Sequence, residues 1–359
     1  MVYGTKGIAA AQAISAFATA ANYLTQLLQI TPPADPAHFS LAFELAETYH
    51  RLGDHTAAQT TLAHLPTITT TLPTNQILLL TLLGEIAGDT GKYEEAHTLL
   101  TQAVALARSH NDATVLCRAL TTLGMVYNRL GQLAAAQAVL QEALVLAEQL
   151  GNLNRKLITL HGLSWVAFQQ DDLREAERLV QQIYEEAAAV GNRERMMAAL
   201  NSLGIAAHKQ GQFALRQERI RAALALAQEI GSKRGIAQSL VNLADGEVRL
   251  GHLAAGRQLA QEALSLALQL EARPWVIQSL ITFARLAYAQ GEPERALALW
   301  GFAQSQPAFM HEHQLDLTET LRLWGIDTAV AQVGLAYGAQ LEWQTTIQEL
   351  LQPSPFTNE

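Results

Sequence analysis

The stretch Thr121-Thr-Leu-Gly-Met-Val-Tyr-Asn-Arg-Leu-Gly-Gln-Leu-Ala-Ala-Ala-Gln-Ala-Val-Leu140 decides the fold. Apolar residues at helical spacing stand on both sides of Gly131, and glycine commonly ends a helix, so the stretch predicts two helices joined by a tight turn. The same pattern recurs with its turn at Gly91, Gly131, Asp171, Gly211, Gly251 and Gly291, in steps of 40 residues. A fixed period of this length predicts stacked helical hairpins.

A second set of breaks has the same spacing and divides the chain into hairpins. These breaks are Asn111, Gly151, Gly191, Gly231 and Glu271. The predicted hairpins span about 37–66, 74–110, 114–150, 154–190, 194–230, 234–270 and 274–306. Short links between helices force neighbouring helices to run antiparallel. Together with a helix at about 7–30 that lacks a partner, the hairpins form a predicted repeat array over 1–306.

The period decays after Gln306-Pro307, although the sequence still predicts helices. We expect an irregular helical cap over 307–351, because a solenoid needs an atypical terminal unit to cover its exposed apolar end. The segment 352–359 is rich in proline and polar residues, and we expect a disordered tail there.

Composition favours helix and argues against nucleic-acid binding. The 359 residues are 49% hydrophobic and carry a net charge of −9, from 24 Lys+Arg against 33 Asp+Glu. A protein that binds the phosphate backbone needs a basic face. A local basic stripe would remain compatible with this balance.

The compartment is expected to be the cytoplasm. Cys117 is the only cysteine, so no intrachain disulfide can form. The sequence contains no run of 18 or more apolar residues, so no membrane span is predicted. Polar residues interrupt the apolar stretch at 8–21, which favours an amphipathic helix over a signal peptide.

Small residues recur seven positions before each turn, where they allow the second helix to approach the first closely. They are Gly84, Gly124, Ser164, Gly204, Ala244 and Ala284. Around the central turn, Leu123-Gly124, Tyr127, Gly131, Leu133 and Ala136 form a pattern that resembles the tetratricopeptide repeat, or TPR, whose usual unit is 34 residues. The 40-residue unit resembles the variant in the C-terminal sensor regions of bacterial signal-transduction (STAND) ATPases of the MalT and LuxR-regulator type. The resemblance implies an all-α, right-handed superhelical solenoid of antiparallel helix hairpins.

No motif of catalysis, cofactor binding or metal binding stands out. The sequence holds no P-loop, no Gly-x-Ser-x-Gly, no His-Glu-x-x-His and no Cys-x-x-Cys. His311 and His313 are close in sequence, but the spacing i, i+2 points them apart on a helix. Cys117 lies on an apolar helix face, which favours a place in the core. The sequence therefore predicts a non-enzymatic protein without cofactor or metal.

The resemblance also implies which side chains face a ligand, because the first helix of each hairpin lines the inner groove in the family. The implied positions are one residue, and four or five residues, after the small position. In this sequence they include Glu85 and Asp89, and the groove residues Met125, Asn128, Arg129, Trp165, Phe168, His208, Lys209, Asp245, Arg249, Arg285 and Tyr288. The groove set also takes His161, Asn201 and Asn242, which stand shortly before the small residue. Exposed aromatics beside Arg and Asn suit a peptide or a small polar ligand. The alternative is that Trp165 and Phe168 pack into the next repeat.

These observations favour a scaffold or sensor that binds a peptide or protein in its concave groove. By resemblance, it would be the C-terminal part of a larger bacterial signalling ATPase with an NTPase domain upstream. Two alternatives stay open, a sensor of a sugar or other metabolite and a self-assembling structural array. We expect neither nucleic acid nor membrane as a direct partner.

Overall fold

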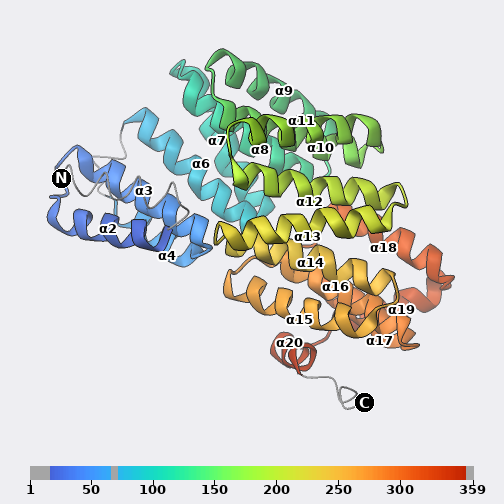
Figure 1. The fold of residues 1–359 in the computed structure, drawn as a ribbon. Coiled ribbons are helices and arrows are strands. Elements are labelled where there is room, and N and C mark those ends of the chain that lie inside the picture. The colour runs from blue at the N-terminus through green and yellow to red at the C-terminus, as the bar shows by residue number, and fades with distance from the viewer. Residues whose placement is uncertain (1–16, 66–71, 353–359) are drawn as a thin grey trace. The chain divides into compact units, whose positions relative to one another are not determined.

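The computed structural model describes residues 17–65 and 72–352, and every regular element in these residues is an α-helix (Figure 1). The predicted helix at 7–30 is described from Phe17 onward. Its first part, the end of the hairpin at 37–66 and the tail at 353–359 lie outside the described residues. No helix in the described residues is long and apolar enough to cross a membrane.

Helices alternate as the two arms of successive hairpins. After α2 (Phe17–Ile30), the first arms are α3 (Ala37–Leu52), α6 (Pro73–Asp89), α8 (Ala113–Arg129), α10 (Leu153–Gln169), α12 (Arg193–Lys209), α14 (Lys233–Arg249) and α16 (Arg273–Ala289). The second arms are α4 (His55–Ala63), α7 (Tyr93–Ser109), α9 (Leu133–Gln149), α11 (Leu173–Ala189), α13 (Phe213–Glu229), α15 (Leu253–Gln269) and α17 (Pro293–Gln304). Three further helices follow, α18 (His311–Trp324), α19 (Thr328–Gly338) and α20 (Trp343–Leu351). The predicted all-α solenoid of antiparallel hairpins is therefore confirmed.

Each turn is closed by a residue in the left-handed backbone region. Gly131 has a φ of 74°, which glycine adopts without steric cost. At three breaks the same conformation is taken by Asn111, Asp171 and Glu271, with φ between 50° and 61°. The turn geometry is thus kept even where the sequence departs from glycine.

The seam between the two arms of a hairpin depends on the small residues that recur in the first arm. A Cβ added to Gly124 would lie 2.4 Å from Cγ of Leu140 in α9, and one added to Gly204 would lie 2.4 Å from Cδ1 of Ile220 in α13. Leu140 and Ile220 are fully buried. The absence of a side chain at the small position is what allows these large apolar residues to fill the seam.

Contacts group the chain into two compact units, which meet in sequence between Gly235 and Ile236. Unit 1 contains the hairpins up to α12 and α13 and the first three residues of α14, which include Arg234. Unit 2 contains the rest of α14, the hairpins that follow, and α18, α19 and α20. The core of unit 2 is built around Trp300 and Phe302 of α17. The predicted division into an array over 1–306, a cap over 307–351 and a tail stays a prediction.

Candidate ligand-binding face

The first arms of unit 1 share a face on which charged side chains gather, here called the inner face. Arg118 of α8 donates to Glu85 of α6 at 2.8 and 3.1 Å and to Glu47 of α3 at 2.5 Å. Burial alone would raise the pKa of Glu85, but the charge and hydrogen bonds of Arg118 lower it to about 2. Three consecutive first arms are thereby joined by one guanidinium.

A second ion pair shows that the inner face curves. Asp89, at the end of α6, accepts from both terminal nitrogens of Arg234, one of them at 2.7 Å. The two residues are 145 positions apart, and α8, α10 and α12 come between them in the series of first arms. Because packed helices lie about 8–10 Å apart, such a contact requires a concave inner face within unit 1.

Two further arginines lie on the inner face and form no ion pair with another helix in the described part of the chain. Arg155 of α10 forms no ion pair with any described residue. Arg195 of α12 reaches only Glu194, its neighbour in sequence, at 3.4 Å, and its buried Nε has no hydrogen-bond partner among the described residues. Burial lowers the pKa of both guanidinium groups. Glu85 opposes this at Arg155 and Glu194 opposes it at Arg195, while neighbouring arginines lower the pKa further. They remain charged, in surroundings that disfavour the charge.

A cavity of about 210 Å³ opens next to Arg155. It lies between α6, α8 and α10, and its lining includes Leu78, Cys117, Arg118 and Arg155. Cys117 is buried as predicted, and burial raises the pKa of its thiol. A protonated thiol is a poor nucleophile, so the cavity offers a cationic and apolar wall rather than a reactive group.

Three of the predicted groove residues come together at the boundary between α8 and α10. The guanidinium of Arg129 lies over the Trp165 ring, 5.6 Å from its centroid, and the rings of His161 and Trp165 meet edge-on with centroids 6.4 Å apart. His161 Nε2 lies 3.0 Å from Ser202 Oγ of α12. Burial lowers the pKa of His161 to about 4, with further lowering by Arg195 and Arg129. His161 is therefore neutral at neutral pH.

Other predicted groove residues in unit 1 make contacts that hold helices together. Phe168 is 2% exposed and packs in the core with Trp165, with centroids 5.7 Å apart. Asn128 donates to the carbonyl of Gly162 at 3.0 Å, and Asn201 is fully buried. Lys209 donates to the carbonyl of Phe168 at 3.2 Å.

Two more residues complete the predicted set in unit 1. The His208 ring lies against Phe213, with centroids 5.5 Å apart, and Met125 is partly exposed. The packing alternative that the sequence left open for Phe168 therefore matches its contacts, whereas Trp165 keeps one face against Arg129.

In unit 2 the C-terminal helix α18 covers the corresponding positions. Arg285 of α16 is 7% exposed and pairs with Asp245 of α14 at 2.5 Å and with Asp316 of α18. The Tyr288 ring stacks on Trp324 of α18 with centroids 4.0 Å apart, and its hydroxyl donates to the Trp324 carbonyl at 3.0 Å. Arg249 also pairs with Asp245 at 3.0 Å, while Asn242 is partly exposed. Most of the predicted set in unit 2 is thus engaged within the chain.

The sequence search did not select Arg155, Arg195, His50 or His55. Arg155 and Arg195 stand nine residues before the small positions Ser164 and Gly204, so a repeat signal existed, but the groove positions that the resemblance implies lie closer to the small residue. His50 and His55 flank the turn at Gly53, a spacing that no standard metal motif covers.

The fold and its regular seams define an α-helical repeat protein. A family model described as tetratricopeptide repeat matches residues 38–109 and 115–187, and a second model with the same description matches residues 279–301. These segments of the chain therefore match the tetratricopeptide repeat. No curated protein matches the chain by sequence.

Solved structures with this fold extend over nearly the whole chain. A Rap protein complexed with competence and sporulation factor is 12% identical, with a TM-score of 0.64 over 94% of this chain and 98% of that one. The Rap conjugation gene regulator of plasmid pLS20, in complex with the Phr* peptide, is 12% identical, with a TM-score of 0.58 over 94% and 96%. Aspartyl phosphate phosphatase F from Bacillus subtilis is 13% identical, with a TM-score of 0.57 over 98% and 94%. At these identities the likeness shows the fold alone.

Proposed function

We propose that this chain is a non-enzymatic binding scaffold whose inner face in unit 1 takes a peptide or protein segment that bears carboxylate groups. The observation that supports this most directly is the pair Arg155 and Arg195, which lie in that face and form no ion pair with another helix among the described residues. Most other guanidinium groups of the face are already neutralised, Arg118 by Glu85 and Glu47.

Arginines of this kind favour an anionic ligand for a physical reason. A partly buried charge loses hydration, and this loss costs free energy unless an opposite charge takes the place of the water. The guanidinium fork matches a carboxylate with two parallel hydrogen bonds. A carboxylate that reaches Arg155 or Arg195 would therefore relieve an existing penalty as well as form new bonds.

The aromatic cluster beside these arginines supports a peptide as the ligand. Trp165 contacts both His161 and Arg129 and is partly exposed, so it offers a flat apolar surface next to a cationic group. Tryptophan and arginine together are the residue types that carry most binding energy at protein interfaces.

The size of the cavity also favours a peptide over a small molecule held alone. Sites that enclose a small-molecule ligand usually measure about 300–1,000 Å³. The cavity beside Arg155 is about 210 Å³, which suits one acidic side chain of a longer segment. The rival proposal, a metabolite sensor, predicts a rise in melting temperature when a sugar or metabolite is added.

The role in a larger signalling ATPase remains a proposal on the resemblance alone. The 40-residue repeat unit supports it, since the sensor regions of that class resemble this array. Expression of the natural reading frame and a nucleotide-hydrolysis assay would test it, and a frame without an NTPase domain would contradict it.

The peptide proposal can be tested with a random heptapeptide library panned on the full chain. We expect selected peptides to be enriched in Asp and Glu or to depend on a free C-terminal carboxylate. Titration calorimetry with one selected peptide should then show a Kd at least about tenfold weaker for Arg155→Gln and Arg195→Gln, since a hydrogen bond to a charged group contributes about 1.5–3 kcal/mol.

Arg193→Gln is the matched control for these variants. Arg193 is also near the start of α12, but it is 58% exposed and pairs with Glu229 at 3.1 Å. Its substitution should leave the Kd unchanged. Enrichment of neutral peptides, or equal affinity for wild type and both inner-face variants, would overturn the proposal.

A further inference from the structure

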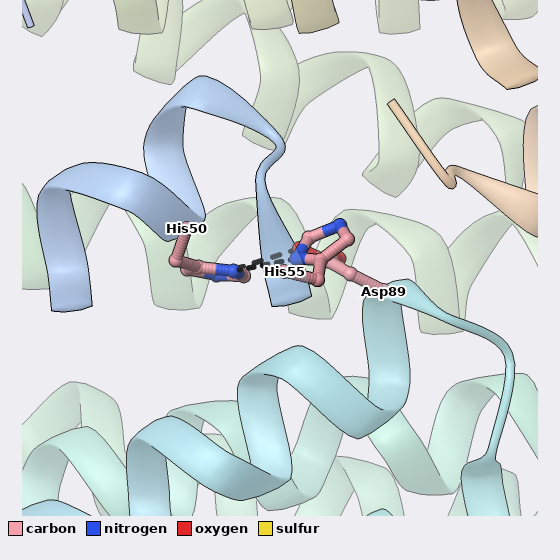
Figure 2. A group of neighbouring side chains, drawn as sticks. All are labelled: His50, His55 and Asp89. Atoms are coloured by element: carbon pink, nitrogen blue, oxygen red, sulfur yellow. Dashed lines mark hydrogen bonds and ion pairs between the residues drawn. The ribbon is translucent and has the colours of Figure 1, made fainter. Parts of the chain in front are cut away.

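Two histidines and an aspartate meet where α3, α4 and α6 come together (Figure 2). His50 Nδ1 lies 3.4 Å from His55 Nδ1, and His50 Nε2 lies 3.4 Å from Asp89 Oδ2. Every residue in this cluster offers a ligand atom within 4.8 Å of the others. Among the described residues, this is the place where three side chains able to bind a metal converge.

The turn at Gly53 is what brings the two imidazoles together. Gly53 takes a φ of 81° and ends α3, and Asp54 then caps α4 by accepting from the Ala57 amide at 2.9 Å. His50 in the last turn of α3 and His55 at the first position of α4 therefore face each other across the turn. Their side chains are 12% and 3% exposed, respectively, so both rings are held in place by packing.

We propose that His50 and His55 bind a first-row transition metal ion of the Zn²⁺ type through their Nδ1 atoms. Zinc–nitrogen bonds are about 2.0–2.1 Å long, and a tetrahedral angle then separates the two nitrogens by about 3.3–3.4 Å. The observed separation of 3.4 Å is the one that such an ion requires. Water or a carboxylate from a ligand would supply the remaining coordination positions.

Asp89 serves this site as the group that orients His50. Histidine ligands commonly direct their second ring nitrogen at a carboxylate, which fixes the ring and increases its basicity. Asp89 has this place on the Nε2 side of His50 through Oδ2, and Arg234 donates to both oxygens of the same carboxylate. The negative charge of Asp89 also offsets the charge of Arg234, which would otherwise repel a cation.

The metal-free explanation of the same contact is a hydrogen bond between the two imidazoles. It requires that one Nδ1 carries the proton and that the other accepts it. Metal binding also uses the neutral imidazole, so both explanations involve the same form of the rings. The separation of the two Nδ1 atoms fits both a bound metal ion and a hydrogen bond, and metal titration distinguishes the two.

The test uses the full chain without a histidine tag, after treatment with a chelator. Titration calorimetry with Zn²⁺ should show one bound ion per chain, and the melting temperature should rise with Zn²⁺ concentration. Binding should weaken at least about tenfold in His50→Gln and in His55→Gln. Substitution of Co²⁺ in the wild-type protein should give the visible absorption of a tetrahedral site with nitrogen ligands.

His64→Gln is the matched control, because His64 ends the same helix α4 but is exposed. This variant should bind Zn²⁺ as the wild type does. Absence of stoichiometric Zn²⁺ and Co²⁺ binding by the wild-type chain would overturn the proposal even if a variant failed to fold. Equal loss of affinity in His64→Gln would overturn it as well, since binding would then reflect scattered surface histidines.

Discussion

At the scale of single residues, the recurring glycine of the first arm is explained by contact with one side chain of the second arm. Gly124 in α8 leaves room for Leu140, whose Cγ would lie 2.4 Å from an added Cβ. This Cγ is the branch point of a buried side chain and not its flexible end. A methyl group can enter only if the two helices separate or Leu140 leaves its rotamer.

We therefore predict that Gly124→Ala lowers the free energy of unfolding by roughly 1–2 kcal/mol. Overpacking a core costs about 1–3 kcal/mol, and alanine returns up to about 1 kcal/mol through its higher helix propensity. Urea unfolding of the full chain measures the difference.

Gly88→Ala in α6 is the control with the opposite sign. An added Cβ there would meet only Cγ2 of Val126 at 3.8 Å, an ordinary contact. The propensity gain should then dominate, and stability should rise by up to about 1 kcal/mol. If both substitutions stabilise the protein, the seam between α8 and α9 is looser than its contacts indicate.

At the scale of helices, the network of Arg118 links α3, α6 and α8 and makes the link depend on pH. The pKa of Glu85 is lowered from 4.5 to about 2. Because the folded-state pKa lies below the unfolded value, the carboxylate stabilises the fold above about pH 4.5, and this contribution is lost as the pH falls toward 2. At about 1.36 kcal/mol per pKa unit, it amounts to roughly 3 kcal/mol.

We predict that Glu85→Gln is less stable than wild type at pH 7 by a few kcal/mol and that the difference shrinks between pH 4.5 and 2. Chemical unfolding at a series of pH values measures it. Glu142→Gln is the control, because Glu142 is exposed and pairs with Arg108 at 2.7 Å between two second arms. A surface pair contributes at most about 1 kcal/mol. A constant difference between Glu85→Gln and wild type across this pH range would contradict the role of Glu85.

The helices of the repeat could be predicted from the sequence, whereas the contacts that the C-terminal helices make with them could not. The 40-residue period specifies a turn, a small residue and an apolar seam in each unit, and these are local signals. Nothing local indicates that Asp316 of α18 pairs with Arg285 of α16, because the period has ended before α18. For that reason Arg285 and Tyr288 were assigned to a groove, although α18 packs against both.

At the scale of the whole molecule, the net charge is negative, whereas Arg155 and Arg195 add positive charge to the inner face. The chain carries −9, which argues against a phosphate-backbone ligand, yet Arg155 and Arg195 lie together on one face of unit 1. Composition averages over the surface, and only the fold places residues 40 positions apart beside each other. The histidines His50 and His55 were missed in the same way, because the third member of their cluster, Asp89, belongs to the next hairpin.

The opposition between net and local charge gives a prediction for the acidic peptide of the proposed function. If local contacts with Arg155 and Arg195 dominate, binding should weaken several-fold when NaCl rises from about 0.05 to about 0.5 M, because salt screens the attraction. If the net charge of −9 dominates instead, the same salt would screen repulsion and tighten binding.

Attraction by the nearby arginines should outweigh repulsion by the net charge, because the screening length at about 0.1 M salt is only about 10 Å. A carboxylate in contact with Arg155 is well within that length, whereas most of the acidic residues lie on other helices of the chain. Calorimetry of the selected peptide at both salt concentrations measures the effect, with the Asp→Asn and Glu→Gln version of that peptide as the control. That control should change little, and an acidic peptide that binds more tightly at high salt would show that its affinity does not come from the arginines of the inner face.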